Sequence, residues 1–516
     1  MKVLLMHPTE EFDLERDLPP ESEDLVEDLG LGTLFGAMAR GDKFILTVAR
    51  AAVLSCLSEP DEIQYRQEVL ADLTAHPQLA IKIYSLATEA LEAHRKVTFW
   101  TLNITPESLR YYSVQSLELL LGYLVRLRRL AEENRSAMVS PALARLGSLL
   151  LTELDDEYIK RLESHLNELK LPGGLMMSAQ LGQANRGTGY TLHRPRPRGL
   201  RERFANRGQA SSSFTVPERD DNVLQALTEL HARGVNIAAN ALAQSTDHVL
   251  GFLNALRVEI AFYVGCINLQ AALGAKGEPT CTPCPLSAGR PGFAADGLYD
   301  PCLSLNLNGR AVGNDVSAST KVLILVTGAN RGGKSTFLRS VGLAQLMMQC
   351  GMFVAAASFS AGVCARVFTH FKRDEDPAMK GGKLDEELAR MSAIVSHICP
   401  GALLLCNEPF ASTNEAEGSE IGRQVFTALC RAGVKIVVVT HLFDLAESLY
   451  EKGVEGTLFM RAPRQAGAAA FRLMEGPPEP TAYGEDVYRR VFGESATAIA
   501  PASPRLGSRP RGESFG

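Results

Sequence analysis

The stretch Gly328-Ala-Asn-Arg-Gly-Gly-Lys-Ser335 decides the fold prediction for this chain of 516 residues. It fits the pattern G-x-x-x-x-G-K-[ST] at every fixed position. An apolar run precedes it at 322–326, and a segment with helical spacing follows at 336–349. Strand, glycine loop and helix in this order surround a phosphate group with backbone N–H groups and a helix N-terminus. The sequence therefore predicts a nucleotide-binding α/β domain.

The residues of this glycine loop suit a phosphate chain. The glycines let the backbone curl so that its N–H groups converge on phosphate oxygens. Lys334 would neutralise the β- and γ-phosphates, and the Ser335 hydroxyl would ligate Mg²⁺. The predicted nucleotide-binding residues are Gly328, Ala329, Asn330, Arg331, Gly332, Gly333, Lys334, Ser335 and Thr336.

Two later apolar runs end in polar residues, as strands of an open α/β sheet do beside a ligand. Residues 402–406 lead to Asn407 and Glu408, and residues 435–440 lead to His441. We expect Glu408 to be the catalytic general base that holds the attacking water. We expect His441 to be a second catalytic residue that senses the γ-phosphate. The alternatives are a helix-start carboxylate for Glu408 and an ordinary strand-end histidine for His441.

Asn407 stands where an aspartate commonly serves Mg²⁺. Its amide can hydrogen-bond to water on the metal, but it brings no negative charge. Ser335 and Asn407 are therefore the predicted metal residues. We expect Mg²⁺ to be held loosely and turnover to be slow.

The periodicity predicts a helical half followed by an α/β half. Apolar residues at helical spacing predict helices over 34–57, 61–73, 78–96, 114–124 and 249–267. Short apolar runs from about residue 303 onwards predict strands over 321–326, 352–357, 402–406 and 435–439. The predicted fold class is α + α/β with a mainly parallel sheet.

Composition excludes several classes of protein. Hydrophobic residues make up 46% and charged residues 22%, which rules out a wholly disordered, collagen-like or small disulfide-stapled chain. The net charge is −6, but residues 1–28 hold ten acids against two basic residues, so the remainder is slightly basic. This acidic head is either a solvated tail or a competitor for a basic surface. Any nucleic-acid surface must be local.

One such local surface is rich in arginine. Residues 186–207 contain seven arginines against the single acid Glu202, with aromatic residues between them. This composition suits DNA phosphates, and a solvated insertion is the equal alternative. The DNA-binding candidates are Arg194, Arg196, Arg198, Arg201 and Arg203.

The cysteines and the N-terminus indicate a cytoplasmic protein. Ten cysteines lie scattered, mostly within apolar runs, and the apolar start at 3–6 is too short for a signal peptide. Residues 340–365 lack charge, but glutamines and a glycine interrupt them, which favours a buried helix feeding a strand over a membrane span. Cys281 and Cys284 form a lone CxxC in a Pro-rich loop, which favours a linker over a zinc site.

The segment Thr327-Gly-Ala-Asn-Arg-Gly-Gly-Lys-Ser-Thr336 resembles the TGxNxGGKST loop of the MutS mismatch-repair family. Asn314-Asp315-Val316 upstream is similar to the family segment beside the nucleotide. Downstream, four elements follow in the family's order: Asn407-Glu408, Ser412-Thr413, Thr440-His441 and Tyr483-Gly484. The resemblance is strong over about 298–493 and weaker over the helical part from about residue 28.

Two departures from the family pattern limit what is carried over. From the position of the helical core near residue 28, we expect this sequence to lack the family's N-terminal mismatch-reading module and its Phe-x-Glu wedge. Where the family presents Ser-Thr-Phe to the partner's nucleotide, this chain reads Lys380-Gly-Gly-Lys-Leu384. We therefore expect ATP binding and hydrolysis, but not necessarily mismatch recognition.

The resemblance implies a DNA-binding ATPase that uses ATP and Mg²⁺ and works as a homodimer. ATP would clamp two heads around double-stranded DNA that is mismatched, branched or distorted, in mismatch repair or a related repair or recombination process. The location would be cytoplasmic (nucleoid-associated in a bacterium), with no membrane partner. The alternatives are a nucleotide-gated scaffold with negligible hydrolysis and an ABC-type ATPase head serving another partner.

Composition, periodicity and the resemblance together give the predicted domain organisation. The segments are an acidic N-terminal segment (1–28), a helical core (29–180), an Arg/Gly/Ser-rich insertion (181–217), lever helices (218–273), a Gly/Pro/Cys-rich loop (274–297), an ABC-type P-loop ATPase domain (298–475), a C-terminal helix (476–500) and a disordered tail (501–516).

Overall fold

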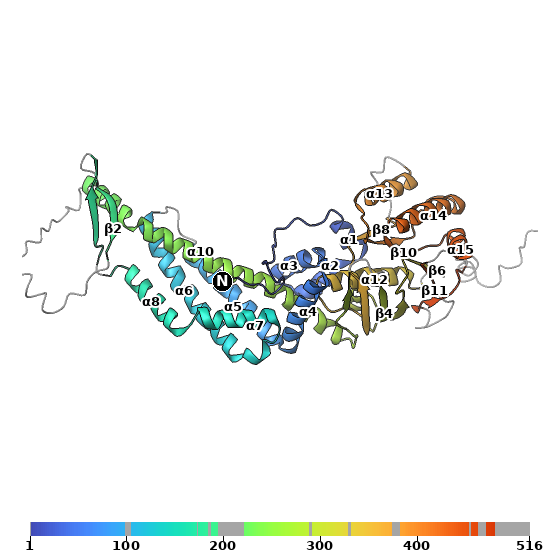
Figure 1. The fold of residues 1–516 in the computed structure, drawn as a ribbon, viewed down its shortest axis with the longest axis horizontal. Coiled ribbons are helices and arrows are strands. Elements are labelled where there is room, and N and C mark those ends of the chain that lie inside the picture. Colours follow the sequence, from blue (N-terminus) through green and yellow to red (C-terminus); the bar gives the residue numbers. More distant parts are fainter. Residues whose placement is uncertain are drawn as a thin grey trace, which may run out of the picture. The chain divides into compact units, whose positions relative to one another are not determined.

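In the computed structural model, the chain forms two compact units. The helical unit holds residues 1–320, 339–369 and 398–404, and the P-loop unit holds 321–338, 370–397 and 405–516. The described residues are 2–98, 105–172, 174–183, 187–193, 221–287, 292–328, 332–373, 382–453, 456–462 and 471–479. Figure 1 labels the elements of both units.

The helical unit confirms the helical half of the prediction. Several helices begin at prolines, whose missing N–H is not needed there: Pro60, Pro106 and Pro141. Its helices are α1 (Ser22–Asp28), α2 (Leu31–Ala39), α3 (Lys43–Leu54), α4 (Pro60–Ala75), α5 (Pro77–Thr98), α6 (Pro106–Glu133), α7 (Pro141–Glu153), α8 (Asp156–Leu169), α10 (Asp221–Gly274) and the short α11 (Pro301–Asn306).

The helix predicted over 34–57 is two helices. Arg40 and Gly41 take positive φ angles of 46° and 91°, which end α2. The Asp42 carboxylate then accepts the N–H groups of Phe44 and Ile45 and starts α3. The apolar period continues across this break because both helices face the same core.

The lever helices predicted over 218–273 form one helix, α10, of 54 residues. It packs along α5 and α6, as Figure 1 shows for the green helix. Thr228–Gly274 is apolar and long enough to cross a membrane, and in this it stands alone among the helices of the described ranges. Yet 67% of its most apolar window is buried, as in the core helix of a globular domain.

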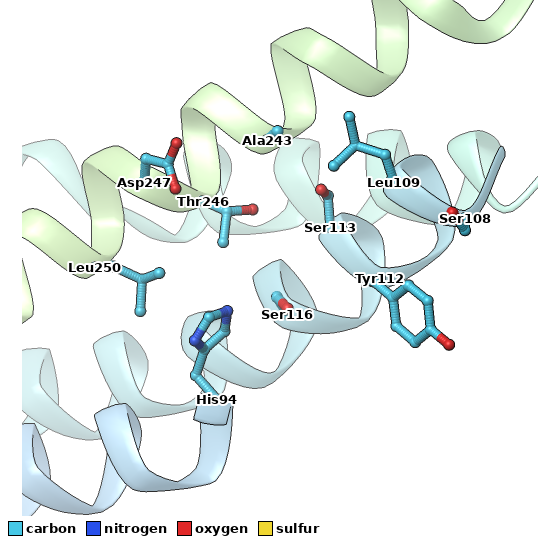
Figure 2. A pocket seen from close by; sticks show the side chains of 10 residues that line it. All are labelled: His94, Ser108, Leu109, Tyr112, Ser113, Ser116, Ala243, Thr246, Asp247 and Leu250. Atoms are coloured by element: carbon cyan, nitrogen blue, oxygen red, sulfur yellow. The ribbon is translucent and has the colours of Figure 1, made fainter. Parts of the chain in front are cut away.

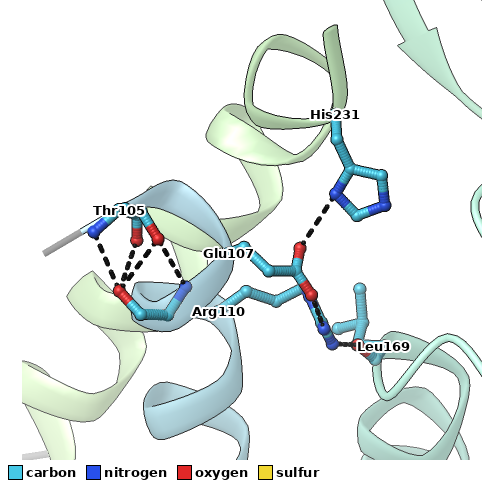
Figure 3. A network of polar contacts seen from close by, with 6 residues as sticks. Thr105, Glu107, Arg110, Leu169 and His231 are labelled. Atoms are coloured by element: carbon cyan, nitrogen blue, oxygen red, sulfur yellow. Dashed lines mark hydrogen bonds and ion pairs between the residues drawn. The ribbon is translucent and has the colours of Figure 1, made fainter. Parts of the chain in front are cut away.

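A polar network joins α6, α8 and α10 at one end of this bundle (Figure 3). Thr105 and Ser108 cap α6 reciprocally. Arg110 donates to the carbonyl of Leu169 at the end of α8 and pairs with Glu107. His231 on α10 lies 3.3 Å from the same Glu107 carboxylate. The network therefore joins the start of α6 to the end of α8 and to α10.

The acidic segment 1–28 is part of the helical unit, not a solvated tail. The side chains of Val3, Leu5 and Met6 are fully buried. The buried Glu259 carboxylate on α10 accepts the backbone N–H groups of Leu5, Met6 and Phe12. Four apolar residues give no usable periodicity, so composition alone misplaced this segment.

Predictions for segments 181–217, 274–297 and 352–357 are corrected. A hairpin of β1 (Met177–Leu181) and β2 (Gly187–Leu192) enters the first segment, which was predicted as a loop or an insertion. The second segment and the residues just after the third contribute to a four-stranded sheet of order β3-β7-β4-β5, with β3 (Cys284–Leu286), β4 (Phe293–Leu298), β5 (Asn314–Ser317) and β7 (Ser358–Gly362). Pairing with β7 makes these Gly- and Pro-rich residues strands, and residues 352–357 only lead into it.

The P-loop unit and its sheet confirm the α/β half of the prediction. The sheet order is β12-β11-β6-β10-β9-β8, and β6 runs parallel to both of its neighbours. Its strands are β6 (Leu323–Gly328), β8 (Val367–Phe371), β9 (Leu403–Asn407), β10 (Lys435–Val439), β11 (Thr457–Ala462) and β12 (Met474–Glu475). Its helices are the first turn of α12 (Lys334–Gln349, of which 334–338 belong to this unit), α13 (Lys383–His397), α14 (Glu415–Arg431) and α15 (Phe443–Glu451).

The Glu259 contact predicts a pH dependence of stability. Burial raises the pKa of Glu259 to about 7, outweighing three backbone hydrogen bonds that lower it. The folded chain therefore binds more protons than the unfolded chain between pH 4.5 and 7. We expect this group's stability contribution, complete below pH 4.5, to fall by about 3 kcal/mol as the pH rises through 7.

Urea denaturation at pH 5 and pH 8 measures this effect. Glu259→Gln should flatten the pH dependence, because the amide does not ionise. Glu132→Gln, on an exposed position of α6, should leave it unchanged. Equal pH dependence in wild type and Glu259→Gln would contradict the assignment.

Candidate nucleotide-binding site

The glycine loop leaves a fully buried strand, β6, at a glycine that no other residue could replace. Gly328 has φ +109°, and a Cβ there would lie 2.6 Å from the carbonyl oxygen of Ala462 on β11. Gly333 has φ +83°, and its Cβ would lie 3.2 Å from the carbonyl oxygen of Phe471. Both ends of the loop therefore require glycine for conformation and for space. The middle residues, 329–331, lie outside the described residues.

Lys334 begins α12 and turns back towards the start of the loop. Its side chain is buried, and its Nζ donates to the carbonyl oxygen of Gly328 over 2.8 Å. Burial lowers its pKa to about 8, and the nearby Glu408 carboxylate opposes this shift. Thr336 follows in the first turn of α12 and is half-buried. The loop thus holds a buried cationic group beside a helix N-terminus.

The two predicted metal residues come together. The Ser335 hydroxyl donates to Oδ1 of Asn407 over 2.9 Å. Both residues offer uncharged oxygen atoms, which Mg²⁺ accepts as ligands or through its waters. The donor set therefore fits a hydrated magnesium ion, but it lacks the carboxylate that would hold the ion tightly.

Glu408 and His441 form the polar centre of the site. Nε2 of His441 lies 2.7 Å from Oε1 of Glu408, and each side chain is about one quarter exposed, 26% and 28% respectively. The hydrogen bond from His441 is the main cause that lowers the pKa of Glu408, against the effect of burial. Glu408 is therefore an ionised carboxylate near neutral pH. The structure gives His441 a contact with Glu408 that the sequence did not predict.

The turn after β9 has an unusual backbone. Glu408 and Phe410 have φ angles of 55° and 60°, in the left-handed region that non-glycine residues rarely adopt. The N–H of Glu408 donates to the carbonyl oxygen of Val439 over 2.8 Å. Phe410 is fully buried and packs near Phe426. Since neither residue is a glycine, no sequence signal marked this turn.

Residues 471–479 are a second feature that the sequence did not predict. Their backbone passes Gly333, and the N–H of Glu479 donates to the Thr327 hydroxyl over 3.3 Å. Arg461 on β11 pairs with the Glu479 carboxylate. The segment therefore closes one side of the loop. The predicted Tyr483-Gly484 motif and the helix over 476–500 lie beyond the described residues, except for 476–479, which are not helical.

The remaining motif residues are structural where the structure describes them. Asn414, after Ser412-Thr413, caps α14 by accepting the Glu417 N–H over 2.9 Å. Asp315, in the helical unit, accepts the Gly297 N–H over 2.7 Å. Of the segment 380–384, the structure describes only residues from Gly382 onwards.

The structure does not test the arginines predicted to bind DNA, and it places the two cysteines of the CxxC motif in the helical unit. Arg194, Arg196, Arg198, Arg201 and Arg203 all lie outside the described residues. The backbone of Cys281 forms an isolated antiparallel β-bridge with Val354, and Cys284 lies exposed in β3. Within the described ranges, no group of three or more His, Cys, Asp or Glu side chains could hold a metal ion.

The helical unit also contains a cavity of about 180 Å³ between α5, α6 and α10 (Figure 2). His94, Tyr112 and Asp247 line it together with serine and threonine hydroxyls. Burial lowers the pKa of His94, while the Asp247 charge opposes the shift. None of the motif residues lines this cavity, so the P-loop unit remains the candidate site.

Two family models match the chain. The model described as the MutS2 N-terminal domain matches residues 58–276, and the model described as MutS domain V matches residues 324–487. The first match falls within the helical unit. The second begins in β6, extends beyond residue 479, the last residue that the structure describes, and includes Glu408 and His441.

Curated relatives include MutS and MutS2 proteins. The DNA mismatch repair protein MutS of Clostridium kluyveri is 25% identical over 49% of this chain and 29% of its own length. The MutS of Methanosarcina mazei is 32% identical over 30% of this chain and 18% of its own length. The Endonuclease MutS2 of Thermus thermophilus is 30% identical over 36% of this chain and 25% of its own length.

The matched regions thus span less than a third of each of these relatives. The two family models, by contrast, match consecutive regions that together take in most of this chain. They agree with a helical unit and a phosphate loop at the end of a central parallel strand. The chain belongs to the MutS family.

Proposed function

We propose that this chain is an ATP hydrolase of MutS type that acts on DNA. The observation that carries the proposal is the Glu408–His441 pair at 2.7 Å, in one unit with the Ser335–Asn407 contact at 2.9 Å and the buried Lys334. Asn407, Glu408 and His441 stand at or just after the ends of β9 and β10, and Lys334 and Ser335 begin α12 after the loop that follows β6. Ligands of open, mainly parallel sheets bind at these strand ends. Together they supply a general base, a cationic hydrogen-bond donor to phosphate, and oxygen ligands for Mg²⁺.

The proposed reaction is attack of water on the γ-phosphate of ATP. The loop N–H groups and Lys334 hold the phosphates, and the Glu408 carboxylate orients the water and accepts its proton. His441, bonded to Glu408, keeps the carboxylate ionised and fixes its direction. Ser335 and Asn407 would hold Mg²⁺, which when bound neutralises charge on the phosphate oxygens.

Asn407 supports slow turnover as part of the proposal. Without a carboxylate at that position, the metal residues carry no negative charge. The same observation favours a second candidate, a nucleotide-gated scaffold with negligible hydrolysis. The presence of an ionised Glu408 at the site argues for the hydrolase.

The relatives support the wider role. Their names include DNA mismatch repair protein and endonuclease. We infer a homodimer that closes on double-stranded DNA in repair or recombination, in the cytoplasm. Mismatched, branched and distorted DNA are the candidate substrates.

Loss of the loop amine should weaken ATP binding. Lys334→Ala removes a buried cation that would bond to phosphate oxygens, so we expect the Kd for ATP to rise about ten- to a hundredfold. Titration with a fluorescent ATP analogue measures the change. Lys452→Ala, at an exposed position of the same unit, is the control. Unchanged affinity in Lys334→Ala would remove the loop from the proposal.

Loss of the proposed base should affect chemistry and not binding. Glu408→Gln keeps the size of the side chain but cannot accept the proton, so single-turnover hydrolysis should fall about a hundredfold or more. ATP affinity should stay within about twofold, since the amide contributes no new repulsion. Glu420→Gln, exposed on α14, controls for loss of charge. A Glu408→Gln variant as active as wild type would contradict the role.

We expect DNA to stimulate ATP hydrolysis. We also expect the protein to bind DNA through the arginines of segment 194–203. Replacing Arg194, Arg196, Arg198, Arg201 and Arg203 together by alanine should lower DNA affinity and flatten its salt dependence, because fewer counterions are released. ATPase rates and binding are compared on duplex, mismatched and branched DNA. Arg423→Ala, on α14, is the control. Unchanged DNA binding in the fivefold variant would exclude this segment as the contact.

A further inference from the structure

Two side chains of helix α13 hydrogen-bond to backbone groups, one in the turn that carries Glu408 and one at the end of β8. The Glu387 carboxylate accepts the backbone N–H of Phe410, two residues after Glu408. Arg390, one turn later, donates to the carbonyl oxygen of Phe371 at the end of β8 over 2.8 Å. All of these residues belong to the P-loop unit. Helix α13 therefore holds backbone groups after β9 and at the end of β8.

The turn needs such support because its backbone is strained. Left-handed φ angles at two non-glycine residues, Glu408 and Phe410, persist only where neighbouring groups enforce them. On one side, the Glu408 N–H bonds to Val439 of β10. On the other side, the Phe410 N–H bonds to Glu387. Glu408 lies between these two anchors, so its direction depends on both.

Glu387 is a buried carboxylate with one oxygen that lacks a hydrogen-bond partner among the described residues. Its side chain is only 8% exposed. Its Oε2 and the Nδ1 of the fully buried His370 are both without a hydrogen-bond partner among the described residues. Burial lowers the pKa of His370, so this neighbour offers no charge to the carboxylate. A half-satisfied buried carboxylate is costly, and such costs are retained mainly where a site requires them.

We propose that Glu387 is a positioning residue, which holds the Glu408–Phe410 turn so that the Glu408 carboxylate faces the phosphate loop. The inference deepens the proposed function and rests on it. Glu387 acts through the Phe410 N–H and not through substrate. Its loss should therefore change the rate of hydrolysis and leave ATP affinity almost unaltered.

Three variants of the full-length chain separate the hydrogen bond from charge and from packing. Glu387→Leu removes the acceptor, and Glu387→Asp keeps the charge but withdraws the oxygens from Phe410. Glu387→Gln keeps an acceptor oxygen at the same reach. Glu386→Gln, the exposed neighbour on α13, is the matched control. Each is measured by single-turnover ATP hydrolysis, ATP affinity, and hydrogen–deuterium exchange of the peptide that contains Phe410.

We expect Glu387→Leu and Glu387→Asp to hydrolyse ATP about ten- to a hundredfold more slowly, with ATP affinity within about twofold and faster exchange at Phe410. Glu387→Gln should restore both rate and protection to within about threefold of wild type. The Asp variant decides the outcome if the Leu variant does not fold. Three outcomes would each overturn the proposal. In the first, Glu387→Asp and Glu387→Leu hydrolyse ATP at the wild-type rate. In the second, Glu387→Gln loses as much activity as Glu387→Asp, and in the third, ATP affinity falls in step with the hydrolysis rate.

The exchange measurement distinguishes this proposal from the proposed function. If wild type does not hydrolyse ATP, or Glu408→Gln is fully active, the proposed function fails, whatever the exchange at Phe410. If wild type hydrolyses ATP, Glu408→Gln is inactive and the Glu387 variants behave as wild type, only the positioning role fails.

Discussion

The site depends on one close approach, between the Cα of Gly328 and the backbone of Ala462. Strand β6 is buried along its whole length and paired on both sides. The chain can leave such a strand only where a residue turns sharply without striking the neighbouring strand, and no side chain fits at Gly328. Lys334 then returns to the carbonyl of Gly328, and Ser335 lies beside Asn407. Both contacts follow from the direction that the loop takes at its first glycine.

A second constraint acts at the end of β9, and it works by a different device. There the chain has no glycine, and Glu408 and Phe410 take left-handed conformations that contacts from β10 and α13 support. The loop and the turn therefore differ in physical origin. The first is permitted by a missing side chain, and the second is imposed by neighbours. A site built in this way holds its base through tertiary contacts that can be altered without touching the nucleotide residues.

The helical unit shows the same contrast between local and distant causes. Its helices follow from apolar periodicity and from proline and Asp caps within a few residues of each start. The position of its N-terminal residues depends on Glu259, about 250 residues away, because the Glu259 carboxylate accepts three of their backbone N–H groups. A buried carboxylate can serve a segment with no secondary structure, because each N–H there lacks a ladder or helix partner.

Local sequence patterns were sufficient to predict the glycine loop, the polar strand ends with Asn407, Glu408 and His441, most helices, and the mainly parallel sheet. These features are encoded within windows of a few residues, as motif chemistry or as a period of hydrophobicity. Tertiary structure alone decided the burial of residues 3–6, the sheet of β3, β4, β5 and β7, the Glu408–His441 contact and the support from Glu387. Each of these joins residues that are distant along the chain, and no local pattern records which distant groups will meet.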